Sequence, residues 1–136
     1  IKTASLPGEI HDMVDSVDYN AIVDSIDKEL KQAIQDWEAG KKYVSRKRAL
    51  MAITQYYDGG GLKGALAKSF SEKRSEGLED KLDDIRKIIS GIGVGSKLAT
   101  GDSLRQKVAF AVAQLRNNVQ ELEARLNPGP IELKQN

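Results

Sequence analysis

The sequence contains no cysteine and a single histidine, so the residues that most often hold metals or act as nucleophiles are scarce. Without cysteine the chain can form neither a disulfide framework nor a thiolate metal site. His11 has no Glu-x-x-His or His-x-x-x-His partner, which excludes the di-metal sites that helical bundles hold. We therefore expect no catalytic residue, no metal, no cofactor and no enzymatic activity.

Long apolar runs are also missing, and neither sign of charge dominates. The chain has 21 basic and 20 acidic side chains and a formal net charge of +1. None of its segments reaches the roughly 20 apolar residues that span a bilayer. A chain this close to neutral has no overall field that draws it to nucleic acid. We expect no membrane span and no nucleic-acid partner, so any electrostatic docking must come from a local patch.

What is present instead is helical periodicity in a chain of 136 residues, which is one domain's length. In the last long segment, apolar residues recur at spacings of 3, 4, 3 and 4, which marks one face of an amphipathic helix. This stripe consists of Val112, Leu115, Val119, Leu122 and Leu126.

Three further stripes precede it. The first predicted helix runs from residue 9 to Gly40, with a kink near Asp18, and Trp37 is expected in the core. The second covers about 43–57, and its expected buried face holds Tyr43, Leu50, Ile53 or Thr54, and Tyr57. The third begins between residues 62 and 71 and ends near 90, with a stripe of Leu78, Leu82, Ile85 and Ile89.

Glycine and proline separate these segments. Three glycines at 59–61 predict a sharp or mobile connection, because glycine disfavours helix. Residues 91–101 predict a longer loop. The last helix is expected to take Asp102 or Ser103 as its N-cap and to stop before Pro128. These patterns predict an all-α protein, an up-down-up-down four-helix bundle over residues 9–127 with an extended N-terminal arm (1–8) and a short C-terminal tail (128–136).

The glycine-rich loop invites comparison with a phosphate-binding loop. Counted from Gly91, however, the position that requires a glycine holds Ser96, and the preceding residues look helical rather than strand-like. We interpret the loop as a connection without nucleotide-binding function.

A cluster of cations after Gly40 is the best candidate for a binding surface. It consists of Lys41, Lys42, Arg46, Lys47 and Arg48. Three interpretations remain open: a solvated helix face, a surface for an acidic protein or anionic membrane, and a nucleic-acid site, which the net charge disfavours. Tyr56 joins the candidates, because adjacent helical residues cannot both face the core and one of Tyr56 and Tyr57 should point outward.

The start at Ile1 rather than Met indicates a processed mature chain, with an excised fragment as the alternative. An extended arm before a cysteine-free four-helix bundle with a basic second helix resembles, in layout over residues 9–127, the small extrinsic proteins of photosystem II, the PsbQ-like group of the thylakoid lumen. The resemblance implies a non-catalytic subunit that caps a membrane complex and supports its water-oxidising centre and its retention of calcium and chloride.

We therefore expect a peripheral structural subunit, located in the thylakoid lumen, that docks on a larger membrane-embedded complex. The alternative is a secreted or effector-type helical module, in a secreted or periplasm-like location, that binds one soluble protein. A third hypothesis is a ligand pocket within the bundle. Apolar stripes do not reveal whose core they fill, so a homo-oligomer stays open.

Overall fold

The computed structural model describes residues 17–127, and these residues are helical with no strand among them. The helices are α2 (Tyr19–Glu38), α3 (Lys42–Met51), the π-helix η1 (Ala52–Asp58), α4 (Leu62–Ser69), α5 (Glu72–Ile89), the short 3-10 helix η2 (Ser96–Leu98) and α6 (Gly101–Leu126). The predicted arm, the tail and the part of the first predicted helix before residue 17 lie outside the described residues.

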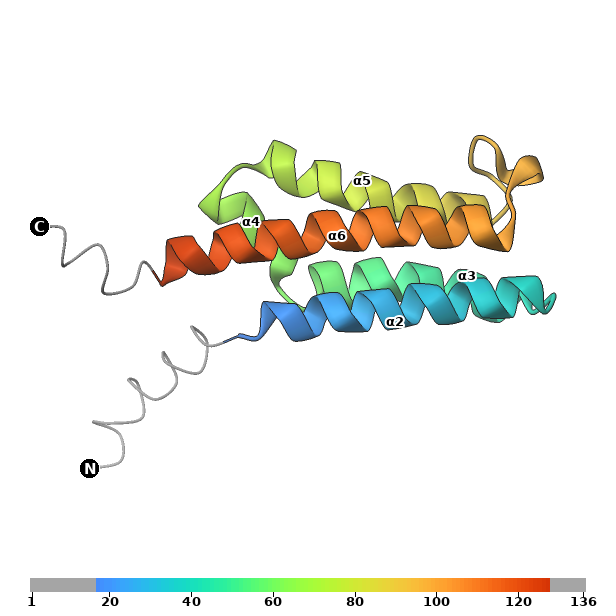
Figure 1. Ribbon diagram of the computed structural model, residues 1–136, viewed down its shortest axis with the longest axis horizontal. Helices are drawn as coiled ribbons and strands as arrows, with labels where there is room; N and C mark the ends of the chain where they lie inside the picture. The colour runs from blue at the N-terminus through green and yellow to red at the C-terminus, as the bar shows by residue number, and fades with distance from the viewer. Residues whose placement is uncertain (1–16, 128–136) are drawn as a thin grey trace, which may run out of the picture.

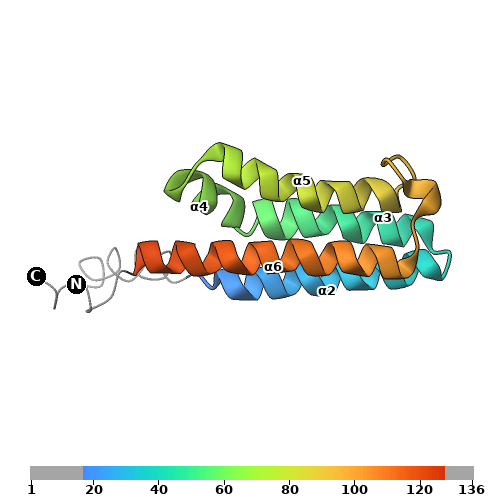
Figure 2. The same cartoon turned by 45° about the horizontal axis from the view of Figure 1, so that its top comes forward.

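The long helices lie side by side and alternate in direction along the chain (Figure 1). α2 packs against α3 and α6, and α5 completes the arrangement by packing against the same two helices. Figure 2 shows this order from another side, with the short α4 beside the end of α6. The turn from α2 into α3 and the loop from α5 into α6 therefore lie at one end of the molecule. We call this the loop end.

The apolar stripes of α2, α5 and α6 form the core as the periodicity predicts. Ile26, Leu30, Leu82 and Leu115 are fully or almost fully buried and belong to one continuous cluster. In α6 the stripe is buried as far as Leu122, but Leu126 in the last turn is 48% exposed. The shared spacing thus identifies the face of the helix but not how far along it burial extends.

Trp37 is only half-buried and packs against the edge of the core. It lies one residue before the end of α2, and its carbonyl oxygen accepts a hydrogen bond from the amide of Gly40 at 3.1 Å. The expectation of a core tryptophan is thus met in part, and Trp37 marks the loop end of the fold.

The predicted buried face of the second helix is wrong at its start. Tyr43 is 69% exposed and Leu50 also faces solvent, whereas Ser45 and Ala49 are buried. The buried Ser45 hydroxyl donates a hydrogen bond to the carbonyl oxygen of Ala33 in α2 at 2.8 Å, so it is not left without a hydrogen-bond partner. Small side chains on this face let α3 lie close to α2, so its large residues point outward.

The π-helix η1 follows from the same face. Buried positions recur at every fourth residue, from Ser45 and Ala49 through Ile53 to Tyr57. A spacing of four drifts around an α-helix of 3.6 residues per turn, and the wider turns of a π-helix reduce that drift. Tyr57 therefore reaches the core, where its hydroxyl donates to the Ser75 carbonyl oxygen at 2.7 Å.

The third predicted helix is two helices, α4 and α5, separated at Phe70 and Ser71. The Ser71 side chain caps α5 by accepting from the amide of Arg74 at 3.0 Å. Two guanidinium groups lie over the Phe70 ring, that of Arg74 at 4.2 Å and that of Arg125 at 4.4 Å from its centroid. The described part of the chain therefore holds five α-helices where the stripes indicate four.

The last helix begins two or three residues earlier than expected. Its N-cap is Thr100, not Asp102 or Ser103, and Thr100 and Ser103 exchange hydrogen bonds as a capping box. Gly101 hides this start from sequence analysis, because glycine at the first helical position lowers the helix signal there.

Two glycine substitutions should change stability in opposite directions. An alanine Cβ at Gly60 would clash with the Tyr56 carbonyl oxygen and lie 3.0 Å from Ile22 Cδ1, so Gly60→Ala should lower the free energy of unfolding by about 1–3 kcal/mol. Gly77 lies inside α5 with nothing within 4 Å of an added Cβ, so Gly77→Ala should raise it by about 0.5–1 kcal/mol. Urea unfolding of both variants measures the two changes, and equal effects would contradict the tight turn at Gly60.

Candidate docking surface

The cations of the second predicted helix lie on the outer face of α3, at the loop end. Gly40, with φ of 80°, reverses the chain after α2, and Lys41 occupies the N-cap of α3. Ser45 and Ala49 are the buried residues of α3, so its other faces are open to solvent. The fold thus presents a basic helix face rather than burying it.

Four of these cations are exposed, and none of them pairs with a carboxylate in the described part of the chain. The side chains of Lys41, Lys42, Arg46 and Lys47, which we call the basic surface, form no ion pair with any carboxylate among residues 17–127. The helices described here therefore leave these positive charges open to a partner.

The placement of these charges is unfavourable for α3 itself. No acidic residue occurs in its first turn, where the positive end of the helix dipole favours one. Lys42 and Arg46 are also four residues apart, a spacing at which like charges repel. Local rules of helix stability are therefore broken at this surface, and such conflicts are typical of functional sites.

Arg48 belongs to the predicted set but has a different role. Its Nη1 lies 2.8 Å from Glu29 Oε1, and its Nε lies 3.0 Å from Asp36 Oδ2, both on α2. The hydrogen bond to Glu29 raises the pKa of Arg48 above its ordinary value, against a smaller opposing effect of desolvation. Arg48 thus ties α3 to α2, and its charge is compensated within the protein.

Apolar side chains lie among the free cations. A shallow groove between α3 and α5 is lined by Tyr43, Arg46, Lys47, Leu50, Arg86 and Ser90. Arg86 is held by Asp83, with 2.7 Å between Nε and Oδ1, so Arg46 and Lys47 supply the uncompensated charge. An exposed tyrosine and leucine beside two free cations suit an acidic partner that also carries apolar side chains.

Tyr56 lies apart from this groove. It is half-buried in η1 and packs against the core, while its neighbour Tyr57 is fully buried. Burial, with a smaller effect of the Glu79 charge and opposed by the hydrogen bond to Ser75, raises the pKa of Tyr57 to about 12. Tyr56 is therefore the outer residue of the pair but not part of the groove lining.

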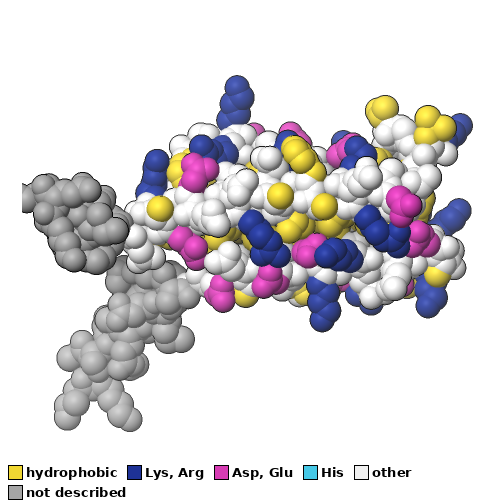
Figure 3. Space-filling model, viewed as in Figure 1, with side chains coloured by type: hydrophobic (Ala, Val, Ile, Leu, Met, Phe, Trp, Pro, Cys, Tyr) yellow, Lys and Arg dark blue, Asp and Glu magenta, His cyan; other side chains and the backbone are white. Residues whose placement is uncertain are grey.

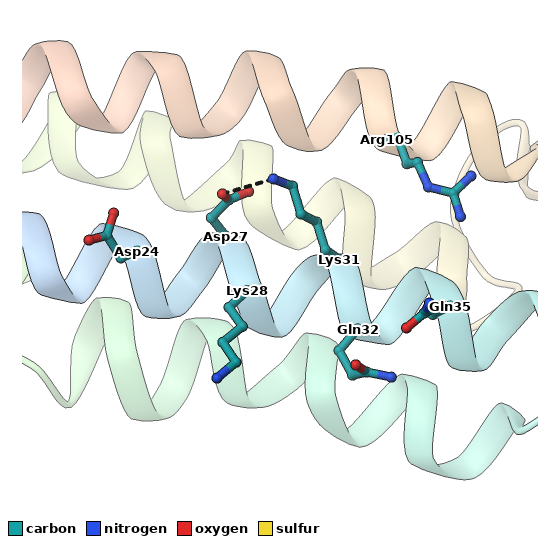
Figure 4. A pocket seen from close by; sticks show the side chains of 7 residues that line it. All are labelled: Asp24, Asp27, Lys28, Lys31, Gln32, Gln35 and Arg105. Atoms are coloured by element: carbon teal, nitrogen blue, oxygen red, sulfur yellow. Dashed lines mark hydrogen bonds and ion pairs between the residues drawn. The ribbon is translucent and has the colours of Figure 1, made fainter.

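A second hollow lies between α2 and α6 (Figure 4), and it carries charges of both signs. Asp27 accepts from Lys31 at 3.1 Å, and Asp24 binds Arg116 at 2.9 Å. Arg105 at its edge is held by Glu38. Ion pairs thus compensate most of the charges that line the hollow, with Lys28 as an additional cation.

Two further kinds of functional feature are a metal site and a membrane-spanning helix. Among residues 17–127, no three His, Cys, Asp or Glu side chains gather in a group that could hold a metal ion. The described helices include none with the length and apolar character needed to cross a membrane. Comparison of the chain with family models, curated proteins and solved structures found no match.

Proposed function

We propose that this chain is a non-catalytic, cofactor-free peripheral subunit that docks through the basic surface on an acidic face of a larger membrane protein complex. The lumenal side of photosystem II is the candidate complex, and the thylakoid lumen the candidate location. The observation that carries the proposal is a set of exposed cations at the start of α3 that pair with no carboxylate of residues 17–127: Lys41, Lys42, Arg46 and Lys47.

Local charge supports this role better than overall charge does. The net charge of +1 gives little long-range attraction, so a partner must meet the cations where they are concentrated. Complementary charges steer the encounter and fix orientation more than they add affinity. Tyr43 and Leu50 beside the cations would supply the apolar contact that holds the docked state.

The scaffold is part of the proposal. We assign the fold to the up-down-up-down four-helix bundles, with α2, α3 with η1, α5 and α6 as the long elements and α4 as an insertion. Their alternating direction supports this assignment (Figure 1). Such a bundle would hold the basic surface rigid, because ion pairs such as Arg48 with Glu29 and Asp36 join α3 to α2.

The test is rebinding to salt-washed photosystem II membranes at low ionic strength. The wild-type chain should bind and be released by about 1 M salt, which shortens the screening length to about 3 Å. A variant with Lys41→Gln, Lys42→Gln, Arg46→Gln and Lys47→Gln should bind more weakly by a factor of about 4 to about 900, since each of the four exposed charges contributes roughly 0.2–1 kcal/mol.

A matched control removes four charges elsewhere, by Lys28→Gln, Lys68→Gln, Lys73→Gln and Lys107→Gln, and should bind as the wild type does. Equal loss in both variants would mean that net charge, not the basic surface, governs binding. Affinity capture that recovers a single soluble protein, with no membrane complex, would instead favour the secreted or effector-type module.

A further inference from the structure

Exposed aliphatic side chains are concentrated in the loop between α5 and α6. Ile92 is 70% exposed, Val94 96% and Leu98 86%. We call these three residues the loop tip. Figure 3 shows yellow side chains gathered on this loop, which projects from the upper right of the molecule. Leaving such residues in water is unfavourable, and clustered exposure of this kind marks an interaction site.

The loop holds these side chains in a defined turn. The amides of Ile92 and Gly93 both donate to the carbonyl oxygen of Lys87, at 2.9 and 3.0 Å. The amides of Ser96 and Leu98 also donate within the loop, each at 3.0 Å. Gly93 passes so close to α5 that a Cβ would lie 2.8 Å from the Ile88 nitrogen. The loop tip is therefore built into the fold, and several of its backbone donors are already satisfied.

Charge around the loop tip is positive. Residues 90–100 contain no acidic side chain, and Lys97 lies between the exposed aliphatic residues. The basic surface begins at the same end of the molecule, in the turn from α2 into α3 (Figure 1). Ser90, the first residue of the loop, lines the groove that contains Arg46 and Lys47.

Carboxylates at the loop end offset only part of this charge. Arg105 binds Glu38, at the end of α2, and also lies 3.5 Å from Asp102, so these three residues together leave one negative charge beside the five cations Lys41, Lys42, Arg46, Lys47 and Lys97. The loop end thus combines projecting aliphatic side chains with an excess of cations.

We propose that the loop tip inserts into the interfacial layer of an anionic lipid bilayer, with Lys97 and the basic surface close to the headgroups. A bilayer accepts a projecting aliphatic group without a preformed pocket, whereas a protein partner would need a matching hollow. Lys97 can place its ammonium group among the headgroups while its aliphatic stem lies beside Leu98. The internal hydrogen bonds of the loop lower the cost of taking its backbone out of water.

This inference does not depend on the proposed docking function. It sets the orientation of the molecule, because the loop lies at one end of the long helices (Figure 2). Insertion of the loop tip would turn the loop end of the helices toward the membrane. It would also hold α3 near the surface, where a membrane-embedded partner could be reached.

The test is sedimentation of the purified 136-residue chain with protein-free lipid vesicles. Vesicles of phosphatidylcholine with about one-third phosphatidylglycerol should bind the chain, and vesicles of phosphatidylcholine alone should bind it much more weakly. The triple variant Ile92→Ser, Val94→Ser and Leu98→Ser should lower the partition coefficient at least tenfold. Lys97→Gln should lower it about fivefold, on the anionic vesicles alone.

The control is Phe110→Ser, which removes a 58% exposed apolar side chain from α6 and should leave partitioning unchanged. All substituted residues are exposed, and circular dichroism would establish that each variant stays folded.

Failure of the wild type to bind anionic vesicles, or equal binding by the triple variant, overturns the inference. So does sedimentation velocity that finds a dimer for the wild type and a monomer for the triple variant, since the loop tip would then bind a second copy. Because the vesicles contain no protein, each of these results leaves docking on a complex to its own test.

Discussion

Leu122→Ala should lower the free energy of unfolding by about 2–5 kcal/mol, the range for a leucine removed from a packed core. Leu122 is fully buried in α6 and belongs to the continuous core cluster. Alanine would remove apolar contact and leave a cavity that the neighbouring helices cannot fully close. Urea unfolding followed by circular dichroism measures the change as a shift in midpoint.

Leu126→Ala is the matched control, because the same substitution is made one turn later on the same stripe. Leu126 is 48% exposed, so its replacement should change the free energy of unfolding by no more than about 1 kcal/mol. Similar losses in both variants would mean that the packing of α6 extends through its last turn, which would contradict the exposure of Leu126.

The second large effect concerns alkaline pH. Stability should fall by about 2–3 kcal/mol between pH 10 and pH 12 as Tyr57 titrates, because its pKa rises from 10.0 to about 12 on folding. The unfolded chain loses the phenol proton near pH 10, while the folded chain keeps it to about pH 12. Within that window deprotonation increasingly favours the unfolded state, and below pH 10 the contribution is constant.

Tyr57→Phe tests this assignment. The variant should lose about 1 kcal/mol at neutral pH with the hydrogen bond to Ser75, yet its stability should fall less steeply above pH 10. Lys63, whose pKa is raised chiefly by its hydrogen bond to Glu79, also loses stabilisation as pH rises, so some slope will remain. Identical slopes in wild type and Tyr57→Phe would assign the alkaline loss to other groups.

Large apolar residues made most of the fold predictable. The stripes that include Ile26, Leu82 and Leu115 are buried as expected, since a helix face is defined by the side chains with most to gain from leaving water. The breaks at glycines 59–61 and in the loop after α5 were also predictable. There the backbone adopts positive φ, 95° at Gly61 and 77° at Gly91, which favours glycine.

Small residues explain the errors. The buried face of α3 consists of Ser45 and Ala49, which carry little hydrophobic signal, so the sequence pattern predicts the larger Tyr43 and Leu50 on that face instead. The break at Ser71 was hidden because serine is tolerated inside helices as well as at caps. Size, rather than periodicity, decides how closely two helices approach, and a pattern of apolar residues does not encode it.

The cluster of cations was predictable from the sequence, but which of them is held in ion pairs within the protein was not. Five cations within eight residues stand out in the sequence, yet only the fold distinguishes Arg48 from the others. Its partners Glu29 and Asp36 are seven residues apart on α2 and so share a face, a signal visible once α2 and α3 are known to be antiparallel neighbours. The loop tip was less predictable. Its glycine-rich composition indicates a connection but does not indicate which side chains are exposed.

The position of Trp37 gives the molecule a built-in optical label. It is the single tryptophan of the chain, it is half-buried, and it lies at the end of α2 beside the turn that leads to the basic surface. An indole at the border between core and solvent changes its emission when water around it is displaced. Excitation selective for tryptophan therefore follows events at the loop end of the unmodified protein, with no dye attached and no contribution from the tyrosines near α4.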